Sequence, residues 1–440
     1  MPIILNRMFS RFPLNRVNGY QFTLLLALLW SGQSSYSNAY SPQALENFIQ
    51  TAIAKDPINK SFDHAKQKSL ADVTLAKQWQ DPKLQWSLAN VPADSLSTSE
   101  DPMTQWRIGL TQEIPNYAEQ SNQQKIASLQ SQMYPFYQAE HRAALRRDIS
   151  QLWFSLFEVH QTIKLYEKNR ALLEQLLAVQ EASYASTETS DRQQALIQAE
   201  LELSHTNDQL LELAQSKAEL IAQFGYWQSP SVLDTLMNTL EESTTDFNLV
   251  SISELNVGAP DFLQHPTLLV LQKKIELSQQ QAELTKAKNK TNWGVTASFS
   301  HRAEDRSDLF SVGLTAQLPF QRSRYLATEV QAIREGTQVL ALQRQEKLRQ
   351  FQTQFHRLNK KFELGLIRLE HYNQTLLAQH HQKTETALSA YTHNDSSIAL
   401  VLKAHVHQLD MKINSLKQLM QQYRIQAEIQ YLATEHQSEH

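Results

Sequence analysis

Two stretches of the chain place apolar residues at alternating intervals of four and three positions. The second series follows the first at a constant distance of 206 residues. An average period of 3.5 residues is typical of helices that wind around each other as a coiled coil. We therefore expect two long helices, each with a buried seam. The seams are Leu145, Ile149, Leu152, Leu156, Val159, Ile163 and Tyr166, and then Phe351, Phe355, Leu358, Phe362, Gly365, Leu369 and Tyr372.

The helical pattern predicts the same organisation twice. Each long helix, 120–183 and 323–388, ends at a polar turn and is followed by a return helix, 192–224 and 397–435, which predicts two antiparallel hairpins. A shorter helical stretch precedes the strands of each half, at 43–80 and 263–290. We infer a tandem repeat of residues 40–224 and 263–435, with an irregular insert at 225–262 and a tail at 436–440.

A period of two residues replaces the helical period before each long helix. Apolar and polar residues alternate over 84–90 and 104–112 in the first half, and over 292–301 and 309–318 in the second. The pattern predicts four strands with one apolar and one polar face. We expect the aromatic residues of the apolar face to contact lipid, and Arg107 on the polar face to point toward a lumen. These expected lipid-facing residues are Trp86, Trp106, Trp293, Phe299 and Phe310.

The N-terminal segment has the pattern of a secretory signal. Arg7, Arg11 and Arg16 precede an apolar run over 22–30, and small residues follow at Ser37 and Ala39. This run of nine residues is too short to span a membrane, so we expect residues 1–39 to be cleaved rather than to act as an anchor. The mature chain is then expected to leave the cytoplasm.

The amino-acid composition further narrows the class of protein to which the chain can belong. Only 9 Gly and 13 Pro occur in 440 residues, which favours long helices, and the absence of cysteine excludes disulfides and thiolate chemistry. A net charge of −4 does not suggest a nucleic-acid partner. The chain lacks the common nucleotide-binding, hydrolase and metalloprotease motifs, so we expect neither an enzyme nor a cofactor.

Strands that cross a membrane must close into a barrel, because an open edge leaves backbone groups unpaired in lipid. Four strands cannot close one, whereas three chains would supply twelve. The predicted fold is therefore mainly α with a small β part. Long antiparallel coiled-coil hairpins would form a periplasmic tube that continues a trimeric 12-stranded outer-membrane β-barrel. A periplasmic sandwich that buries the apolar face is the alternative reading of the strands.

This order of elements resembles the TolC-type outer-membrane factors, the exit ducts of tripartite efflux and type I secretion systems. The first hairpin, with Asp81-Pro82, Asn90-Val91-Pro92, Asp101-Pro102 and 109–115, is similar to CzcC/CusC-like members that serve heavy-metal pumps. The chain departs from many relatives at Asn116-Tyr117, where they have Gly-Lys. The resemblance implies a homotrimer in the outer membrane of a Gram-negative bacterium. Its implied partners are a periplasmic adaptor (membrane fusion protein) and a resistance-nodulation-division pump, and its implied cargo is heavy-metal cations, with drugs and dyes left open.

The turns of the two hairpins would meet around the threefold axis at the periplasmic tip. Glu188, Asp191 and Asp395 are the acidic residues placed to form rings there, which would attract cations and repel each other. The alternative is that these residues only cap helices and form turns. Fifteen histidines are present, but their spacing favours surface positions over a metal site. A periplasmic adaptor or a coiled-coil scaffold is the competing function, although neither accounts for two matched hairpins and four strands.

Overall fold

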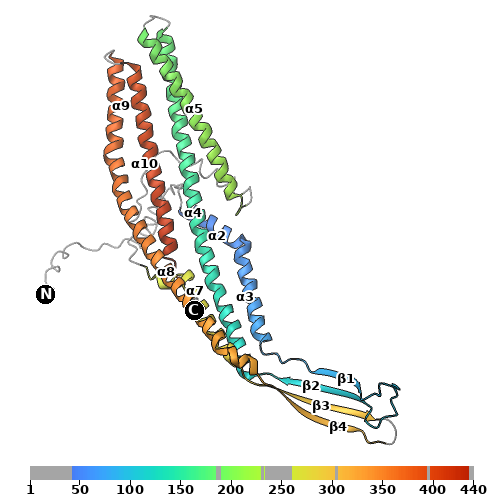
Figure 1. The fold of residues 1–440 in the computed structure, drawn as a ribbon. Coiled ribbons are helices and arrows are strands. Elements are labelled where there is room, and N and C mark those ends of the chain that lie inside the picture. Colours follow the sequence, from blue (N-terminus) through green and yellow to red (C-terminus); the bar gives the residue numbers. More distant parts are fainter. Residues whose placement is uncertain are drawn as a thin grey trace, which may run out of the picture.

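The computed structural model describes residues 42–184, 190–228, 232, 260–302, 306–393 and 397–435. Long helices and one four-stranded sheet form an elongated, bent molecule with the strands at one end (Figure 1). The expected mainly helical fold with four antiparallel strands is confirmed. The segment 1–39, most of the insert 225–262 and the tail 436–440 lie outside the described residues.

The first half begins with two helices rather than with one continuous helix over 43–80. Pro57 is the first residue of the second helix, and Asp56 caps it by accepting hydrogen bonds from the backbone N–H groups of Ile58 and Asn59. The chain turns at this cap. The elements of this half are α2 (Pro42–Lys55), α3 (Pro57–Leu75), β1 (Lys83–Ala89), β2 (Gln105–Ile114), α4 (Tyr117–Tyr184) and α5 (Ser190–Phe224).

The second half has the corresponding elements in the same order. Pro266 begins its first helix, as Pro57 does, and the ring Nδ1 of His265 accepts the hydrogen bond of the Thr267 N–H at 3.2 Å. A π-helical turn η2 (Tyr372–Leu376) separates α8 from α9. The other elements are η1 (Phe262–Gln264), α7 (Pro266–Lys288), β3 (Asn292–Arg302), β4 (Leu309–Gln317), α8 (Phe320–His371), α9 (Leu377–Thr392) and α10 (Ile398–Leu432).

The α4 helix is the longest described helix and contacts helices of both repeats. It is continuous for 68 residues despite Pro135, which corresponds to about 100 Å at 1.5 Å per residue. The second predicted seam is buried throughout, with Phe351 and Phe355 3% and 4% exposed. In the first seam Leu145, Ile149 and Leu156 are buried, whereas the other four residues, Leu152, Val159, Ile163 and Tyr166, are half-buried. Burial of the seams against neighbouring helices provides the main stabilisation of these long elements.

The helices form one curved layer, and their order near the sheet differs from their order farther away. Near the sheet the order is α3, α4, α7 and α8, and farther from it the order is α5, α4, α10 and α9 (Figure 1). Arg424 of α10 contacts Glu158 of α4 at 2.8 Å across the junction between the repeats. The edge helices therefore come from the first repeat on one side and from the second repeat on the other.

The sheet has the order β1-β2-β3-β4 with antiparallel pairing throughout. Strand β2 of the first repeat pairs with β3 of the second, so the sheet joins the two repeats just as the helical layer does. At the exit of β2, the Asn116 side chain donates to the Ala287 carbonyl at 2.8 Å and accepts from the Ala118 N–H at 3.1 Å. Asn116 thus links the start of α4 to the end of α7.

Candidate functional site

The strand register places most apolar side chains of the four strands on one face, while Leu309, opposite Ser300, lies on the other. Trp86 is opposite Ile108, Ile108 is opposite Phe299, and Phe299 is opposite Phe310. The rings of Trp86 and Trp106 stack with centroids 5.1 Å apart. The aromatic residues that we expect to contact lipid are all exposed on this face: Trp86 68%, Trp106 41%, Trp293 53%, Phe299 44% and Phe310 72%.

The opposite face of the sheet is polar and is held together by cross-strand hydrogen bonds. Arg107 Nε donates to Ser300 Oγ at 3.3 Å, and the hydroxyls of Thr111 and Thr296 are 3.0 Å apart. Lys83 forms a salt bridge with Glu113. In a single chain an exposed face of Trp, Phe, Leu and Val is unfavourable in water, so this sheet is built for an apolar environment on one side.

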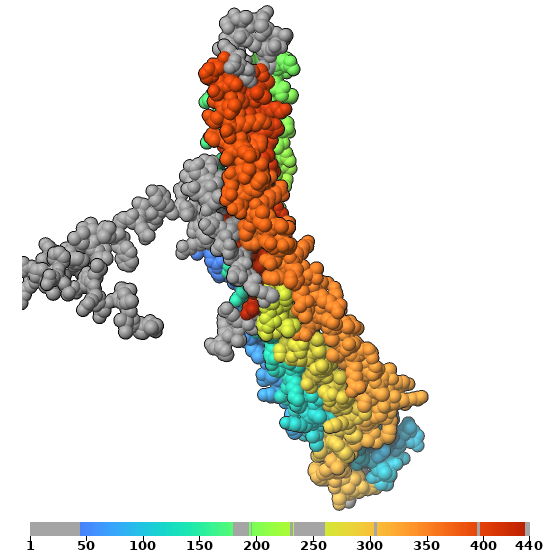
Figure 2. Space-filling model, turned by 90° about the vertical axis from the view of Figure 1, so that its left-hand side faces the viewer, coloured from blue at the N-terminus to red at the C-terminus, as the bar shows by residue number. Residues whose placement is uncertain are grey.

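Among the described elements, the sheet and the helical layer each end in edges without a further neighbour. In the single chain β1 and β4 each have one strand neighbour, and α3 and α8 flank the helical layer above the sheet. Figure 2 shows α8 and α9 along the length of one side of the molecule. The edge helices also expose apolar side chains, which are Ile58, Leu70 and Leu75 on α3, Val339, Leu342, Leu364 and Ile367 on α8, and Ile197, Leu201 and Leu211 on α5.

The acidic residues expected at the helical tip fall mainly outside the described residues. Glu188 and Asp395 are not described, and Asp191 lies in the first turn of α5 with its side chain undescribed. Their role at a tip therefore stays a prediction. Among the described residues, no group of three or more His, Asp or Glu side chains could hold a metal ion.

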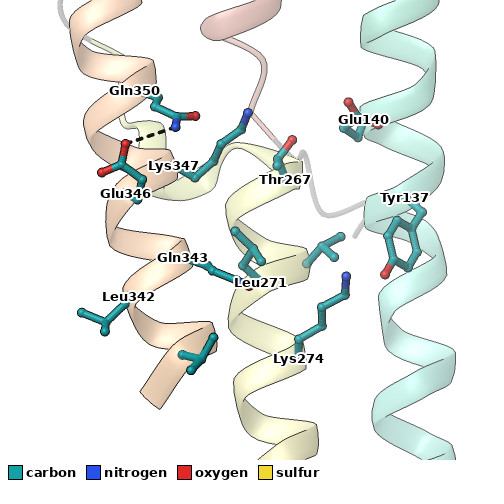
Figure 3. Close-up of a pocket in the computed structure, with 12 residues that line it drawn as sticks. Tyr137, Glu140, Thr267, Leu271, Lys274, Leu342, Gln343, Glu346, Lys347 and Gln350 are labelled. Atoms are coloured by element: carbon teal, nitrogen blue, oxygen red, sulfur yellow. Dashed lines mark hydrogen bonds between the residues drawn. The ribbon is translucent and has the colours of Figure 1, made fainter. Parts of the chain in front are cut away.

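A groove of about 800 Å³ lies between α4, α7 and α8 and was not predicted from the sequence (Figure 3). Lys274 Nζ lies 5.9 Å from the centre of the Tyr137 ring, and Gln350 donates to Glu346 at 3.1 Å. Aliphatic side chains including Leu271 and Leu342 complete the walls. The groove thus combines aliphatic walls with a few polar and charged side chains. No described helix is long and apolar enough to cross a membrane.

The fold can be compared with solved structures. The chain matches no protein-family model and no curated protein. It superposes on the Campylobacter jejuni CmeC outer membrane channel with a TM-score of 0.72 at 10% identity, covering 89% of this chain and 86% of that one. The outer membrane protein VceC of Vibrio cholerae gives 0.70 at 13% identity over 89% and 96%, and CusC gives 0.71 at 13% identity over 92% and 96%. The chain has the fold of the TolC-type outer-membrane channels.

Proposed function

We propose that this protein is the outer-membrane exit duct of a tripartite efflux system and acts as a homotrimer without catalysing a reaction. The observation that carries the proposal is the exposed apolar face of a four-stranded sheet whose two edges are open. Lipid can cover such a face only if the edges are paired, because unpaired backbone groups cost several kcal/mol each in the hydrocarbon region.

The order of the elements supports closure by three copies. At each level one open edge belongs to the first repeat, namely β1, α3 and α5, and the other belongs to the second repeat, namely β4, α8 and α9. A second copy can therefore add its first-repeat edge to the second-repeat edge of this one in both the sheet and the helical layers. Three copies would give twelve strands, which lies within the range of outer-membrane barrels, and a continuous helical tube below them.

Partners and cargo follow from the exit-duct function and from the first hairpin. The proposal places the barrel in the outer membrane of a Gram-negative bacterium and the tube in the periplasm. There a periplasmic adaptor and an inner-membrane pump, proposed to be of the resistance-nodulation-division type, would supply energy and cargo. We propose heavy-metal cations as the cargo on the similarity of residues 81–115 to the CzcC/CusC-like members. Residues 1–39 would direct export as a cleaved signal.

The first experiment is to locate the mature protein and measure the mass of its protein component in mild detergent. Three chains in the outer-membrane fraction are expected. A soluble periplasmic monomer would contradict the proposal and would favour an adaptor or a coiled-coil scaffold. If the trimer is found, a deletion strain is expected to be more sensitive to heavy-metal salts. Sensitivity only to drugs or dyes would overturn the proposed cargo and leave the duct unaffected.

A further inference from the structure

The ionised side chains of the four strands lie on the polar face, and most of them are basic. The register pairs Arg107 with Ser87 and Ser300, and it pairs Arg302 with Gln105 on the same face. Lys83 and Glu113 complete the set, so the strands carry three basic side chains and one acidic one. The excess is two positive charges per chain.

Within the part of the sheet that the structure describes, neither arginine forms a salt bridge. The salt bridge of Lys83 with Glu113 lies at the end of the sheet nearest the helices, and His301 of the apolar face contacts Asp308 at 2.8 Å. Arg107 instead donates to the Ser300 hydroxyl. The Arg302 guanidinium donates to the Ser307 carbonyl at 3.1 and 2.7 Å. Both of these described partners are neutral, so neither contact offsets the positive charge of its arginine.

Acidic residues are present nearby but lie in the loops beyond the strands. Asp94, Glu100 and Asp101 belong to the connection between β1 and β2, where Glu100 accepts from Ser95 and Asp101 accepts from the Met103 N–H at 2.7 Å. These donors are neutral, so the carboxylates keep their charge as the arginines do, but they lie in the loop beyond the ends of the strands. Arg107 is the third residue of β2 and Arg302 is the last residue of β3, so both lie at the loop end of the sheet.

We propose that Arg107 and Arg302 of the three copies form a basic belt just inside the outer mouth of the barrel, which hinders cations and favours small anions. The belt rests on the proposed function, because it requires the polar face to line the lumen. Charges gathered around one axis and bounded by a low-dielectric wall produce a strong local potential. Arginine stays charged at every physiological pH, so the belt acts independently of pH.

The belt gives the duct a property beyond passive conduction. A pump can drive cargo outward past a repulsive region, whereas cations outside must cross the same barrier by diffusion alone. The belt would therefore limit the return of metal cations from the exterior. Salt screens charges over about 8 Å at physiological ionic strength, so the effect is expected to increase as the salt concentration falls.

A single cysteine can report the potential inside the mouth, because the native chain contains none. Ser311 of β4 is exposed and lies on the polar face opposite Ser298. Cells or outer-membrane vesicles carrying Ser311→Cys would be treated from outside with anionic and with cationic methanethiosulfonates. The ratio of the two labelling rates measures the local charge and does not require the periplasmic tip to be open. The ratio is expected to favour the anionic reagent.

Replacing the arginines tests whether they, rather than other charges, determine the ratio of the labelling rates. In the Ser311→Cys background, Arg107→Gln and Arg302→Gln are each expected to lower the anionic-to-cationic rate ratio severalfold. Arg107→Lys keeps the charge and is expected to leave most of the ratio intact. Lys66→Gln removes a positive charge from the exposed surface of α3 and serves as the matched control, with no change expected.

The possible outcomes distinguish failure of the proposed belt from failure of the proposed exit-duct function. An unchanged ratio in both Arg107→Gln and Arg302→Gln, with Ser311→Cys still reactive, would overturn the belt alone. If Val312→Cys on the apolar face reacts with the water-soluble reagents and Ser311→Cys does not, the polar face does not line a lumen, and the proposed function fails with the belt. As a second measurement, conducting trimers in a KCl gradient are expected to shift their reversal potential toward cation preference on Arg107→Gln.

Discussion

Gly365 of α8 packs so closely against Gln422 of α10 that a β-carbon at position 365 would overlap the Gln422 side-chain amide. Gln422 is 1% exposed, and the neighbouring Gln418 Nε2 donates to the Gly365 carbonyl at 3.3 Å. A close helix approach of this kind is possible only where one residue has no side chain. Gly365 is also the only glycine in the apolar seam of α8.

Gly365→Ala is expected to destabilise the helical part by about 1–3 kcal/mol, because the buried Gln422 must move within a packed interface. Thermal unfolding followed by circular dichroism in detergent would measure the change. Gln422→Ala removes the overlapping side chain, so the double variant should lose less stability than the sum of the two single variants.

Gly336→Ala is the matched control in the same helix. A β-carbon there would meet nothing within 4 Å, so alanine should stabilise α8 by about 0.5–1 kcal/mol through its higher helix propensity. Equal effects of alanine at positions 336 and 365 would contradict the proposed close packing.

His265 connects the start of α7 to the end of α10. Its Nε2 lies 3.2 Å from the Tyr431 carbonyl oxygen, and its Nδ1 accepts the Thr267 N–H, so the ring is neutral with its proton on Nε2. Complete burial lowers the pKa of His265 from 6.5 to about 4, and Lys347 adds a smaller effect in the same direction. Protonation of Nδ1 would remove the acceptor that caps α7.

Stability is expected to fall in mild acid because of this histidine. Between pH 6.5 and about 4 the unfolded chain binds a proton at His265 that the folded chain does not, so the free energy of unfolding decreases as the pH falls. The contribution is complete above pH 6.5, and its full loss is on the order of 3 kcal/mol per chain. Melting temperatures measured across this range would show the decrease.

His265→Asn retains a capping side chain but cannot titrate. The variant is expected to be less stable than the native protein near neutral pH, because it loses the packing of the ring against Phe351 and Tyr431. Its melting temperature should depend less on pH between 6.5 and 4. A pH dependence identical to that of the native protein would show that other groups are responsible.

The fold could be predicted largely because its two periodicities are regular. The 3.5-residue seams predicted the coiled-coil helices, and the alternation around Trp86 and Phe299 predicted the strands and their faces, because side-chain direction follows directly from backbone geometry. The break at Asp56 and the π turn at Tyr372–Leu376 were not predicted. Both depend on local capping and on packing against α10 and α4. Neither the capping nor this packing leaves a periodic pattern in the sequence.

Only the part of the candidate site that is set by the alternation of side chains along the strands could be predicted. Arg107 was expected on the polar face, and the register places it there next to Ser300. Arg302 was missed, because the predicted strand ended at residue 301, although its position in the alternation would have placed it on the same face. The groove beside Leu271 combines three helices that are distant in sequence, so no local pattern could reveal it.

The acidic residues of the helical turns remain the candidates for gating. If Asp191 and Asp395 form rings around the threefold axis, Asp191→Ala and Asp395→Ala should reduce cation preference and alter single-channel conductance, and Glu188→Ala should act in the same direction. Asp208→Ala, in the same α5 helix but away from the turn, is the control. Unchanged conductance and selectivity in all three tip variants would leave only the capping and turn roles.

The two faces of β4 allow a direct test of which side contacts lipid. Val312 and Ser311 are adjacent and exposed in the single chain, but they lie on the apolar and polar faces respectively. Lysine on the lipid side of a barrel costs about 2–4 kcal/mol near the middle of the membrane, whereas lysine in the lumen remains hydrated. Val312→Lys should therefore reduce the amount of assembled trimer in the outer membrane, and Ser311→Lys should assemble normally. Equal tolerance of both variants would show that the apolar face does not contact lipid, since lysine at either exposed position would then be accommodated in water.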